Sequence, residues 1–219
     1  MSLIKISPDI LKEFYLKCSP DESTPTLYFS PNRLIRWFFW LRLEVIIKLI
    51  LKSMDKFETC LDFGGGGGEF LPTLSRYFQK VVLLDLNTER ASKVVNFFDL
   101  KNVDLLEKDV FHTDTDNEQY SLIVAADVLE HFIESEQVIK ILKKKLNKDG
   151  LLITSLPTEG FSYVILRAIL GIKKPDDHYY CSHEVELMLE KAGFIKGHRV
   201  YLPFKYNIFA LFSITVWTH

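Results

Sequence analysis

The sequence predicts an α/β fold, a doubly wound and mostly parallel sheet of seven strands that ends in an antiparallel hairpin. Strand signals alternate with helix signals over residues 59–157, a pattern typical of parallel strands joined by right-handed crossovers. The last two β-rich runs, 195–202 and 206–217, are separated only by residues 203–205, which leaves no room for a crossover helix. Five consecutive glycines follow the first strand, at the edge where such sheets bind ligands.

The chain of 219 residues is long enough for one domain with a sizeable core and a small appendage. We expect residues 1–58 to form a helical N-terminal extension or lid and residues 59–219 to form the main domain. Helices are predicted at about 8–17 and 33–53, on either side of a loop rich in Ser, Pro and acidic residues.

The predicted helix at 33–53 is both apolar and basic. Its basic residues are Arg33, Arg36, Arg42, Lys48 and Lys52. Most of them lie within half of the helical circle, but Arg42 falls off this arc. Basic residues with Trp and Phe are typical of a helix that lies in a membrane interface, so residues 33–52 could make a peripheral membrane contact. Because the polar arc also contains Trp37, Trp40 and Leu41, the sequence favours a helix that covers the sheet or the ligand site.

The glycine run, Gly64 to Gly68, directly follows the apolar stretch 59–63. Glycine permits positive φ and lets a ligand lie against bare backbone. The dinucleotide fingerprint G-x-G-x-x-G would need a third glycine at 69, 70 or 71, and none is present. The phosphate loop is also excluded, because no Lys-Ser or Lys-Thr pair follows. A flexible linker is the alternative, although a linker has no reason to follow a strand of the buried type.

The remaining elements follow in regular order. Strands are predicted at 80–86, 103–108, 120–126 and 151–156, and helices at 69–78, 89–98, 134–146 and 183–191. Asn87 and Thr88 are expected to cap the second of these helices. The sequence Asn147-Lys148-Asp149-Gly150 is expected to form the turn before the fifth strand.

Composition excludes several classes of protein. The apolar share of 47% argues against disorder, and a net charge of −2 argues against a general nucleic-acid surface. Cys18, Cys60 and Cys181 are far apart and odd in number, so we expect reduced thiols in a cytoplasmic protein and no metal site. Neither a signal peptide nor a membrane-spanning stretch is expected.

The pattern D-x-G-x-G-x-G, formed by Asp62, Gly64, Gly66 and Gly68, resembles the first motif of the class I S-adenosylmethionine-dependent methyltransferases. Further stretches that resemble this family are Leu83–Leu86, Glu107–Val110, Tyr120–His131 and Leu146–Ile153. One departure is Ser121, where the family usually has Asp. The resemblance implies a Rossmann-like fold, S-adenosylmethionine as cofactor and S-adenosylhomocysteine as product.

The resemblance also implies roles for individual residues. Asp62 and the alternate glycines would hold the methionine end of the cofactor. Asp85, followed by Leu86 in the same motif, would accept hydrogen bonds from the ribose hydroxyls.

The third and fourth matching stretches would complete the cofactor site. Asp109 would accept from the adenine amino group, with the backbone amide of Val110 facing the ring. Backbone carbonyls at Ala125 and Ala126 would hold the methionine ammonium. An ordinary turn is the alternative role for Asp109.

The acceptor is less well defined. His178 precedes by a few residues a helix that begins with Ser182-x-Glu184. This arrangement resembles small-molecule O-methyltransferases, including those that act on polyprenyl-quinone precursors, which implies a hydroxyl on a small or lipid- or glycan-linked acceptor. His178 is the first candidate for the base and His131 the second. Residues 27–52 and 161–180 would close over the acceptor as an apolar lid.

Several alternatives stay open from the sequence. The acceptor atom could instead be an amine nitrogen or a carbon. A nicotinamide oxidoreductase is opposed by the glycine spacing, and a non-catalytic relative by the full set of acids. A nucleic-acid methyltransferase is opposed by the charge balance and by the absence of an N-P-P-[YF] run. The oligomeric state is not indicated.

Overall fold

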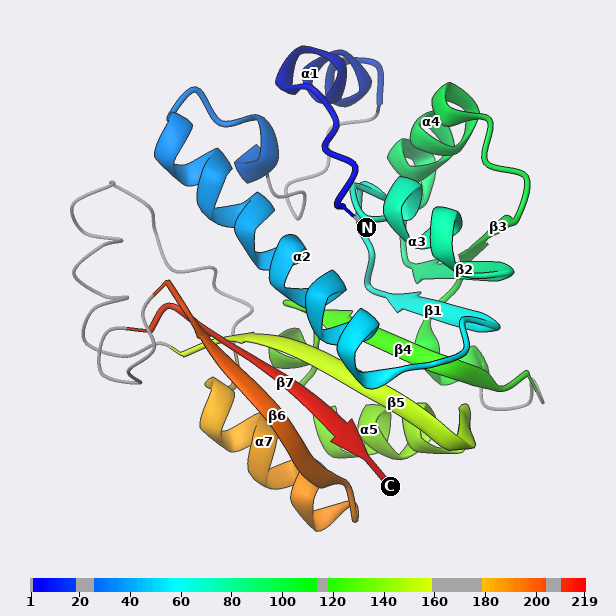
Figure 1. The fold of residues 1–219 in the computed structure, drawn as a ribbon, viewed down its shortest axis with the longest axis vertical. Coiled ribbons are helices and arrows are strands. Elements are labelled where there is room, and N and C mark those ends of the chain that lie inside the picture. The colour runs from blue at the N-terminus through cyan, green and yellow to red at the C-terminus, as the bar shows by residue number, and fades with distance from the viewer. Residues whose placement is uncertain (1, 19–25, 114–117, 159–178, 204–209) are drawn as a thin grey trace. The chain divides into compact units, whose positions relative to one another are not determined.

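A computed structural model describes residues 2–18, 26–113, 118–158, 179–203 and 210–219 (Figure 1). Seven strands form one sheet in the order β3-β2-β1-β4-β5-β7-β6, which confirms the predicted α/β fold. The chain divides into two compact units, Met1–His112 and Thr113–His219, and each is described by itself.

The first unit contains a three-stranded parallel part of the sheet. Its elements are α1 (Pro8–Leu16), η1 (Thr26–Phe29), α2 (Arg33–Ser53), β1 (Thr59–Phe63), α3 (Leu71–Tyr77), β2 (Lys80–Asp85), α4 (Glu89–Phe98), β3 (Val103–Glu107) and η2 (Val110–Thr113). In the strand register Phe63 pairs with Leu84, and Asp85 pairs with Glu107. The loops that follow the three strands therefore leave the sheet at the same edge.

The two helices predicted in the N-terminal extension are confirmed. Helix α1 begins after Ser7, whose hydroxyl accepts from the Ile10 amide. Helix α2 begins after Asn32, whose side chain accepts from the Leu34 amide at 2.9 Å. A polar cap of this kind satisfies an amide that the helix itself leaves unpaired, which explains why both helices start where they do.

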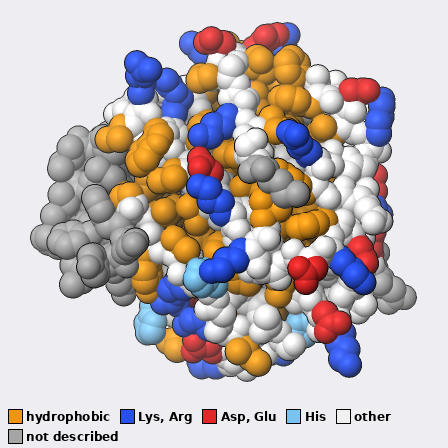
Figure 2. Space-filling view, in the orientation of Figure 1, with side chains coloured by type: hydrophobic (Ala, Val, Ile, Leu, Met, Phe, Trp, Pro, Cys, Tyr) orange, Lys and Arg blue, Asp and Glu red, His pale blue; other side chains and the backbone are white. Residues whose placement is uncertain are grey.

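One face of α2 is buried. The buried side chains are Phe38, Trp40, Arg42, Leu43, Ile46, Ile47, Leu49 and Ile50. Leu34 and Trp37 near its start are exposed. Figure 2 shows hydrophobic side chains together with Lys and Arg over the helix that Figure 1 labels α2. In the described part of the chain, no helix is long and apolar enough to cross a membrane.

The second unit contains the other four strands. Its elements are β4 (Tyr120–Ala126), η3 (Leu129–His131), α5 (Ser135–Lys144), β5 (Leu146–Pro157), α7 (Ser182–Lys191), β6 (Ile195–Leu202) and β7 (Phe212–Thr218). Strand β5 is parallel to β4, whereas β7 is antiparallel to both β5 and β6. The predicted terminal hairpin is thus confirmed, although β7 begins at Phe212 and residues 204–209 lie outside the described ranges.

The expected turn at Asn147–Gly150 is wrong, because these residues belong to β5. Tyr120 pairs with Leu146 and Leu122 pairs with Leu151, so the extra residues of β5 form an irregularity in the ladder. A Cβ on Gly150 would lie 3.0 Å from the Tyr120 carbonyl oxygen. It would lie equally close to the Asn147 carbonyl oxygen. The glycine is therefore explained by the close approach of backbone from Asn147 and from the neighbouring strand, and not by a helix end.

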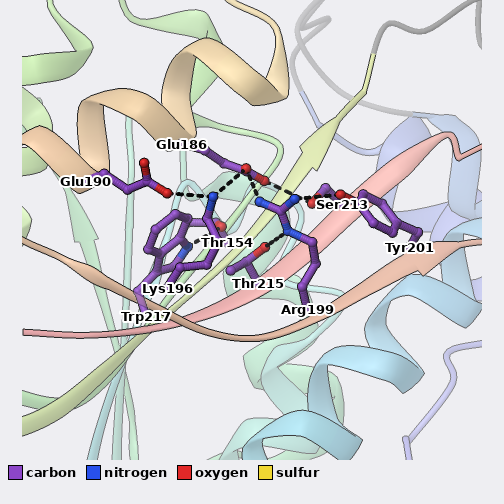
Figure 3. A network of polar contacts seen from close by, with 9 residues as sticks. All are labelled: Thr154, Glu186, Glu190, Lys196, Arg199, Tyr201, Ser213, Thr215 and Trp217. Carbon is purple, nitrogen blue, oxygen red and sulfur yellow. Dashed lines mark hydrogen bonds and ion pairs between the residues drawn. The ribbon is translucent and has the colours of Figure 1, made fainter. Parts of the chain in front are cut away.

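A charged network joins α7 to the antiparallel strands (Figure 3). The Glu186 carboxylate lies at its centre with 5% of its side chain exposed. It pairs with Arg199 and, at 3.2 Å, with Lys196, and it accepts from the Ser213 hydroxyl at 3.0 Å. Glu190 pairs with the same Lys196 at 2.6 Å nearer the surface. Two cations thus share one buried carboxylate, and one of them also has a second, exposed carboxylate partner.

Replacing Glu186 with glutamine is expected to lower the free energy of unfolding by about 1–3 kcal/mol. The substitution leaves the part-buried Arg199 without its carboxylate, whereas Lys196 keeps Glu190, and the loss is reduced because both cations are partly solvated. Urea unfolding monitored by circular dichroism measures the change. The matched control is Glu190→Gln on the exposed side of the network, which should change stability little. Equal effects of the two substitutions would contradict a central role for Glu186.

Candidate functional site

The glycine loop after β1 uses three of its glycines for backbone conformation. Gly64, Gly66 and Gly68 have φ values of 67°, 53° and 76°. Residues that carry a Cβ rarely adopt φ values in this left-handed region. These are the three glycines of the D-x-G-x-G-x-G pattern, so the pattern describes the positions at which the backbone itself requires glycine.

The other two glycines are required by carboxylates that pack against the loop. A Cβ on Gly65 would lie 2.7 Å from Oδ2 of Asp62, and a Cβ on Gly67 would lie 2.6 Å from Oε1 of Glu69. Bare backbone at these two positions therefore leaves room for two acidic side chains. Each of the five glycines is therefore explained, three by a positive φ and two by the close approach of a carboxylate.

The two acids are buried. Asp62 is 4% exposed and Glu69 is 6% exposed. Among the described residues, Oδ2 of Asp62 has no hydrogen-bond partner. Burial raises the pKa of Asp62 to about 7, with further contributions from the negative charges of Asp85 and Glu69. Burial also raises the pKa of Glu69. The loop therefore covers an acidic site that would gain from a bound cation or hydrogen-bond donor.

Asp85 ends β2 and contacts the loop. Its Oδ2 accepts from the Gly66 amide at 2.8 Å, and its Oδ1 accepts from the Asn87 amide at 3.2 Å. An ionised carboxylate has about four acceptor positions, so a further pair of hydroxyl donors can be accommodated. The next side chain, Leu86, is 72% exposed and offers an apolar surface beside this carboxylate.

The start of α4 differs in detail from the sequence prediction. Thr88 does not cap the helix with its side chain, because its hydroxyl and amide both donate to Oε2 of Glu107, at 2.9 and 3.0 Å. These two hydrogen bonds lower the pKa of Glu107. Asn87 supplies the cap, since its Oδ1 accepts from the Glu89 amide at 2.9 Å. Glu107 therefore links the loops after β2 and β3.

Asp109 and Val110 lie at the start of η2. Oδ1 of Asp109 accepts from the Phe111 amide at 3.0 Å, which is the local turn contact considered as the alternative for this residue. The contact leaves a half-buried carboxylate that can accept further hydrogen bonds. Val110 is buried. The structure is thus compatible with both the turn role and the adenine role of Asp109.

Two residues that reasoning from the sequence missed lie in the N-terminal extension. The guanidinium of Arg42 donates to the Tyr28 hydroxyl at 2.8 Å, and both residues are buried. Burial raises the pKa of Tyr28, Arg42 opposes this rise, and the charges of Glu69 and Asp62 reinforce it. The only sequence signal was the position of Arg42 off the charged arc of its helix.

The remaining candidates belong to the second unit. Ala126 ends β4, and His131 ends η3 in a half-buried position. Asp127, between them, has φ 54°, a conformation that few residues other than glycine adopt, and its amide donates to the Ser155 carbonyl at 2.8 Å. His178 lies outside the described residues, as does most of the predicted lid segment 161–180.

No three His, Cys, Asp or Glu side chains gather as metal ligands within the ranges that the structure describes.

A family of proteins described as a methyltransferase domain matches residues 39–196 of the chain. The matched segment includes the glycine loop, the five candidate acids and histidines (Asp62, Asp85, Asp109, His131 and His178), and most of the sheet. No curated protein sequence matches the chain significantly.

Solved structures with the same fold cover nearly the whole chain. An N-methyltransferase, NodS from Bradyrhizobium japonicum WM9 in complex with S-adenosyl-l-homocysteine, is 15% identical with a TM-score of 0.67, covering 95% of this chain and 97% of that one. Magnesium protoporphyrin IX methyltransferase from Synechocystis PCC 6803 with bound S-adenosylhomocysteine is 16% identical with a TM-score of 0.67, covering 95% and 92%. A SAM-dependent methyltransferase from Aquifex aeolicus is 22% identical with a TM-score of 0.61, covering 98% and 100%.

Proposed function

Because the chain belongs to the methyltransferase-domain family, we propose that it methylates a hydroxyl oxygen of a small-molecule, lipid-linked or glycan-linked acceptor. The chain is an enzyme, and its methyl donor is S-adenosylmethionine. When bound, this cofactor supplies an electrophilic methyl group on a sulfonium. The protein contributes mainly by positioning donor and acceptor for an in-line displacement.

The observation that carries the cofactor assignment is the buried Asp62 beneath a bare glycine loop. Its Oδ2 lacks a partner among the described residues, and burial holds the pKa near 7. The methionine end of S-adenosylmethionine carries an ammonium, which is both a cation and a donor. Binding it beside this carboxylate would offset the free energy that burial of the acid costs.

Asp85 would bind the ribose. Its two oxygens already accept one backbone amide each, and the positions that remain suit the two vicinal hydroxyls of a ribose. The exposed Leu86 and the buried Val110 would lie against the adenine, with Asp109 as acceptor for its amino group. In the second unit, the carbonyl of Ala126 is proposed to accept from the methionine ammonium.

A hydroxyl acceptor requires a base, and histidine suits this role near neutral pH. His178 remains the first proposal and His131 the second. An amine acceptor is the second candidate function, because the similar structure NodS is named an N-methyltransferase. A free amine would need no strong base, so the two candidates differ in their dependence on these histidines.

We further propose that residues 1–58 act as an extension over the cofactor half of residues 59–219. The Ile4 amide donates to the Thr73 hydroxyl on α3 at 2.9 Å, and this contact between the extension and the main domain supports the proposal.

The experiment is calorimetry followed by an acceptor screen with full-length protein. S-adenosylhomocysteine should bind, and NADH, which tests the nicotinamide alternative, should not. Transfer of a radiolabelled methyl group is then measured with two kinds of hydroxyl acceptor, phenols and polyprenylated quinols, and with primary amines. Labelling of the hydroxyl compounds that is lost in His178→Gln or His131→Gln supports the proposal. Labelling of amines alone would reject the hydroxyl assignment. Transfer that neither substitution affects would reject the histidine base.

A further inference from the structure

We propose that the amino-terminal end of α2 binds the surface of an anionic lipid bilayer through Arg33, Leu34, Arg36 and Trp37. These four residues are called the α2 start cluster below. They lie within the first two turns of the helix, which begins after Asn32, and they belong to the first unit. The inference goes beyond the proposed function, because it concerns where the enzyme is held and not the reaction that it catalyses.

Two large apolar side chains of the cluster face solvent. Leu34 is 61% exposed and Trp37 is 52% exposed. They are three positions apart on a helix, so they lie on the same face. The structure thereby separates the two tryptophans of α2, because Trp40 is 5% exposed and packs edge-on against Tyr28, with ring centroids 5.1 Å apart. Trp40 is a core residue, whereas Trp37 and Leu34 together form an apolar surface that would gain from leaving water.

The two arginines of the cluster keep their positive charge uncompensated. Arg36 donates to the carbonyl oxygens of Ser30 and Pro31, at 2.5 and 3.3 Å, and these acceptors are neutral. Arg33 is exposed. Within the ranges that the structure describes, neither arginine pairs with a carboxylate. The sequence has no Asp or Glu anywhere between positions 23 and 43, so the chain itself supplies no nearby anion in this stretch.

Local helix stability does not account for two cations at this end of α2. The amino-terminal end of a helix carries a partial positive charge, so acidic side chains stabilise it and basic ones do not. The first turn of α2 contains no acidic residue, and its cap is the neutral side chain of Asn32, which accepts from the Leu34 amide at 2.9 Å. The arginines and the helix dipole therefore concentrate positive charge at one place.

The charge of α2 is opposite in sign to the charge of the chain. The helix contains five basic residues and one glutamate, a net charge of +4, within a chain whose net charge is −2. The glutamate, Glu44, pairs with Lys48 at 2.8 Å and with Lys5 at 3.6 Å, about two turns beyond Trp37. A locally positive face on an otherwise acidic protein favours an anionic partner.

An anionic bilayer matches both properties of the cluster. Its phosphate headgroups would accept from the arginines, and the boundary beneath them would receive Leu34 and Trp37, since indole is favoured at this depth. A second copy of the chain matches less well, because a symmetric contact would bring the arginines of both copies together. A nucleic acid would compensate the arginines but would leave Leu34 without an apolar partner. Figure 2 shows this mixture of hydrophobic and basic side chains over α2.

The test is flotation of the full-length protein, without cofactor, with vesicles of phosphatidylcholine alone or mixed in equal parts with phosphatidylglycerol. Wild type should bind the mixed vesicles about 10–100-fold more tightly than the neutral ones, because each arginine near an anionic surface contributes several-fold. Added salt should weaken this binding. Tryptophan emission should move to shorter wavelengths on binding, and the change reports Trp37 because Trp40 and Trp217 are buried.

Substitution of the arginines measures the electrostatic part. Arg33→Gln combined with Arg36→Gln should lower the affinity for the mixed vesicles about 10-fold or more. The matched control is Lys140→Gln combined with Lys191→Gln, which removes the same charge from exposed positions on α5 and α7. The control should lower the affinity less than about 3-fold. Circular dichroism checks the fold of each variant.

Substitution of the exposed leucine measures the apolar part. Leu34→Gln should lower the affinity for the mixed vesicles about 3–10-fold, since a half-exposed leucine has part of its apolar surface left to bury. Leu187→Gln, at an exposed leucine on α7, is the control and should bind as wild type does. If the double arginine variant does not fold, Arg36→Gln and Leu34→Gln carry the test separately.

Four results would overturn the inference. Wild type could bind neither kind of vesicle or both equally, or the two double variants could lose affinity equally, which would reduce the effect to overall charge. Vesicle binding that leaves Trp37 emission unchanged and is displaced by heparin would assign the face to a soluble polyanion. A dimer that Leu34→Gln dissociates would assign it to a second copy. Because no measurement uses cofactor or acceptor, wild type that binds the mixed vesicles but not S-adenosylhomocysteine would reject the proposed function and support the bilayer contact.

Discussion

Asp85→Ala is expected to weaken the binding of S-adenosylhomocysteine by about 1.5–3 kcal/mol, or roughly 10–150-fold in Kd. The substitution removes the acceptor proposed for both ribose hydroxyls. It also removes the acceptor of the Gly66 amide, which at 2.8 Å holds the centre of the glycine loop. Both effects act on the same ligand, so the loss should fall near the upper end of this range. Titration calorimetry gives the affinity directly.

A suitable control is Asp104→Ala on the neighbouring strand. Asp104 is exposed and pairs with Lys80 at 3.3 Å, a surface contact that contributes little. The control should bind as wild type does. Thermal unfolding of Asp85→Ala without cofactor distinguishes the two effects. A loosened loop should lower Tm, whereas loss of the ligand contact alone should leave Tm unchanged. Unchanged affinity in Asp85→Ala would remove this residue from the site.

The sequence predicted the glycine loop only in part. Its alternate glycines follow a linear pattern, because a positive φ is a local property of the backbone. Gly65 and Gly67 have a different origin, since the side chains of Asp62 and Glu69 fold back against them. Such an approach depends on rotamers and packing, which residue order alone does not specify. Glu69 was accordingly seen only as the residue that breaks the dinucleotide fingerprint.

The α/β class, the terminal hairpin and most element boundaries could be predicted because alternation of buried strands and helices restricts the topology. The turn expected at Asn147–Gly150 was wrong for an instructive reason. Asn, Asp and Gly are favoured locally in turns, but here residues 147–150 are extra residues within β5, between the pairs Tyr120–Leu146 and Leu122–Leu151. Tertiary pairing overrode the local preference.

The buried pair in the N-terminal extension could not be predicted. Tyr28 and Arg42 are 14 positions apart, and they meet only once η1 and α2 have packed together. A helical wheel can show that Arg42 departs from the charged arc, but it does not show what the arginine meets. The sequence therefore indicated the cofactor class but not the buried contact between these two residues.

Asp62→Asn is expected to change how stability depends on pH. The pKa of Asp62 is raised from 3.8 to about 7 in the folded state, mainly by burial and further by Asp85 and Glu69. Between about pH 4 and 7 the folded state therefore binds one more proton than the unfolded state, and the free energy of unfolding falls as pH rises. The full loss attributable to this group is about 2–4 kcal/mol, and it levels off above pH 7.

The asparagine variant lacks this titration, so its stability relative to wild type should increase steadily from pH 4 to 7 in urea unfolding without cofactor. Glu69 and Asp85 are present in both proteins, so the difference between the two curves reports Asp62 together with its electrostatic coupling to these two acids. Curves that stay parallel across this range would show that Asp62 is not held near neutrality by its surroundings.

The same substitution should weaken cofactor binding even as it stabilises the free protein at pH 7.5. Asparagine keeps the size of the side chain but cannot compensate the charge of an ammonium, so affinity for S-adenosylhomocysteine should fall by about 10-fold or more. In wild type, binding near pH 6.5 should release a proton, because a cation beside Asp62 lowers the pKa of this carboxyl. Calorimetry in two buffers with different ionisation enthalpies measures that proton. An acid that lowers the stability of the free protein but raises its affinity for the ligand is retained for binding. If Asp62 had only a structural role, neither the released proton nor the loss of affinity would be observed.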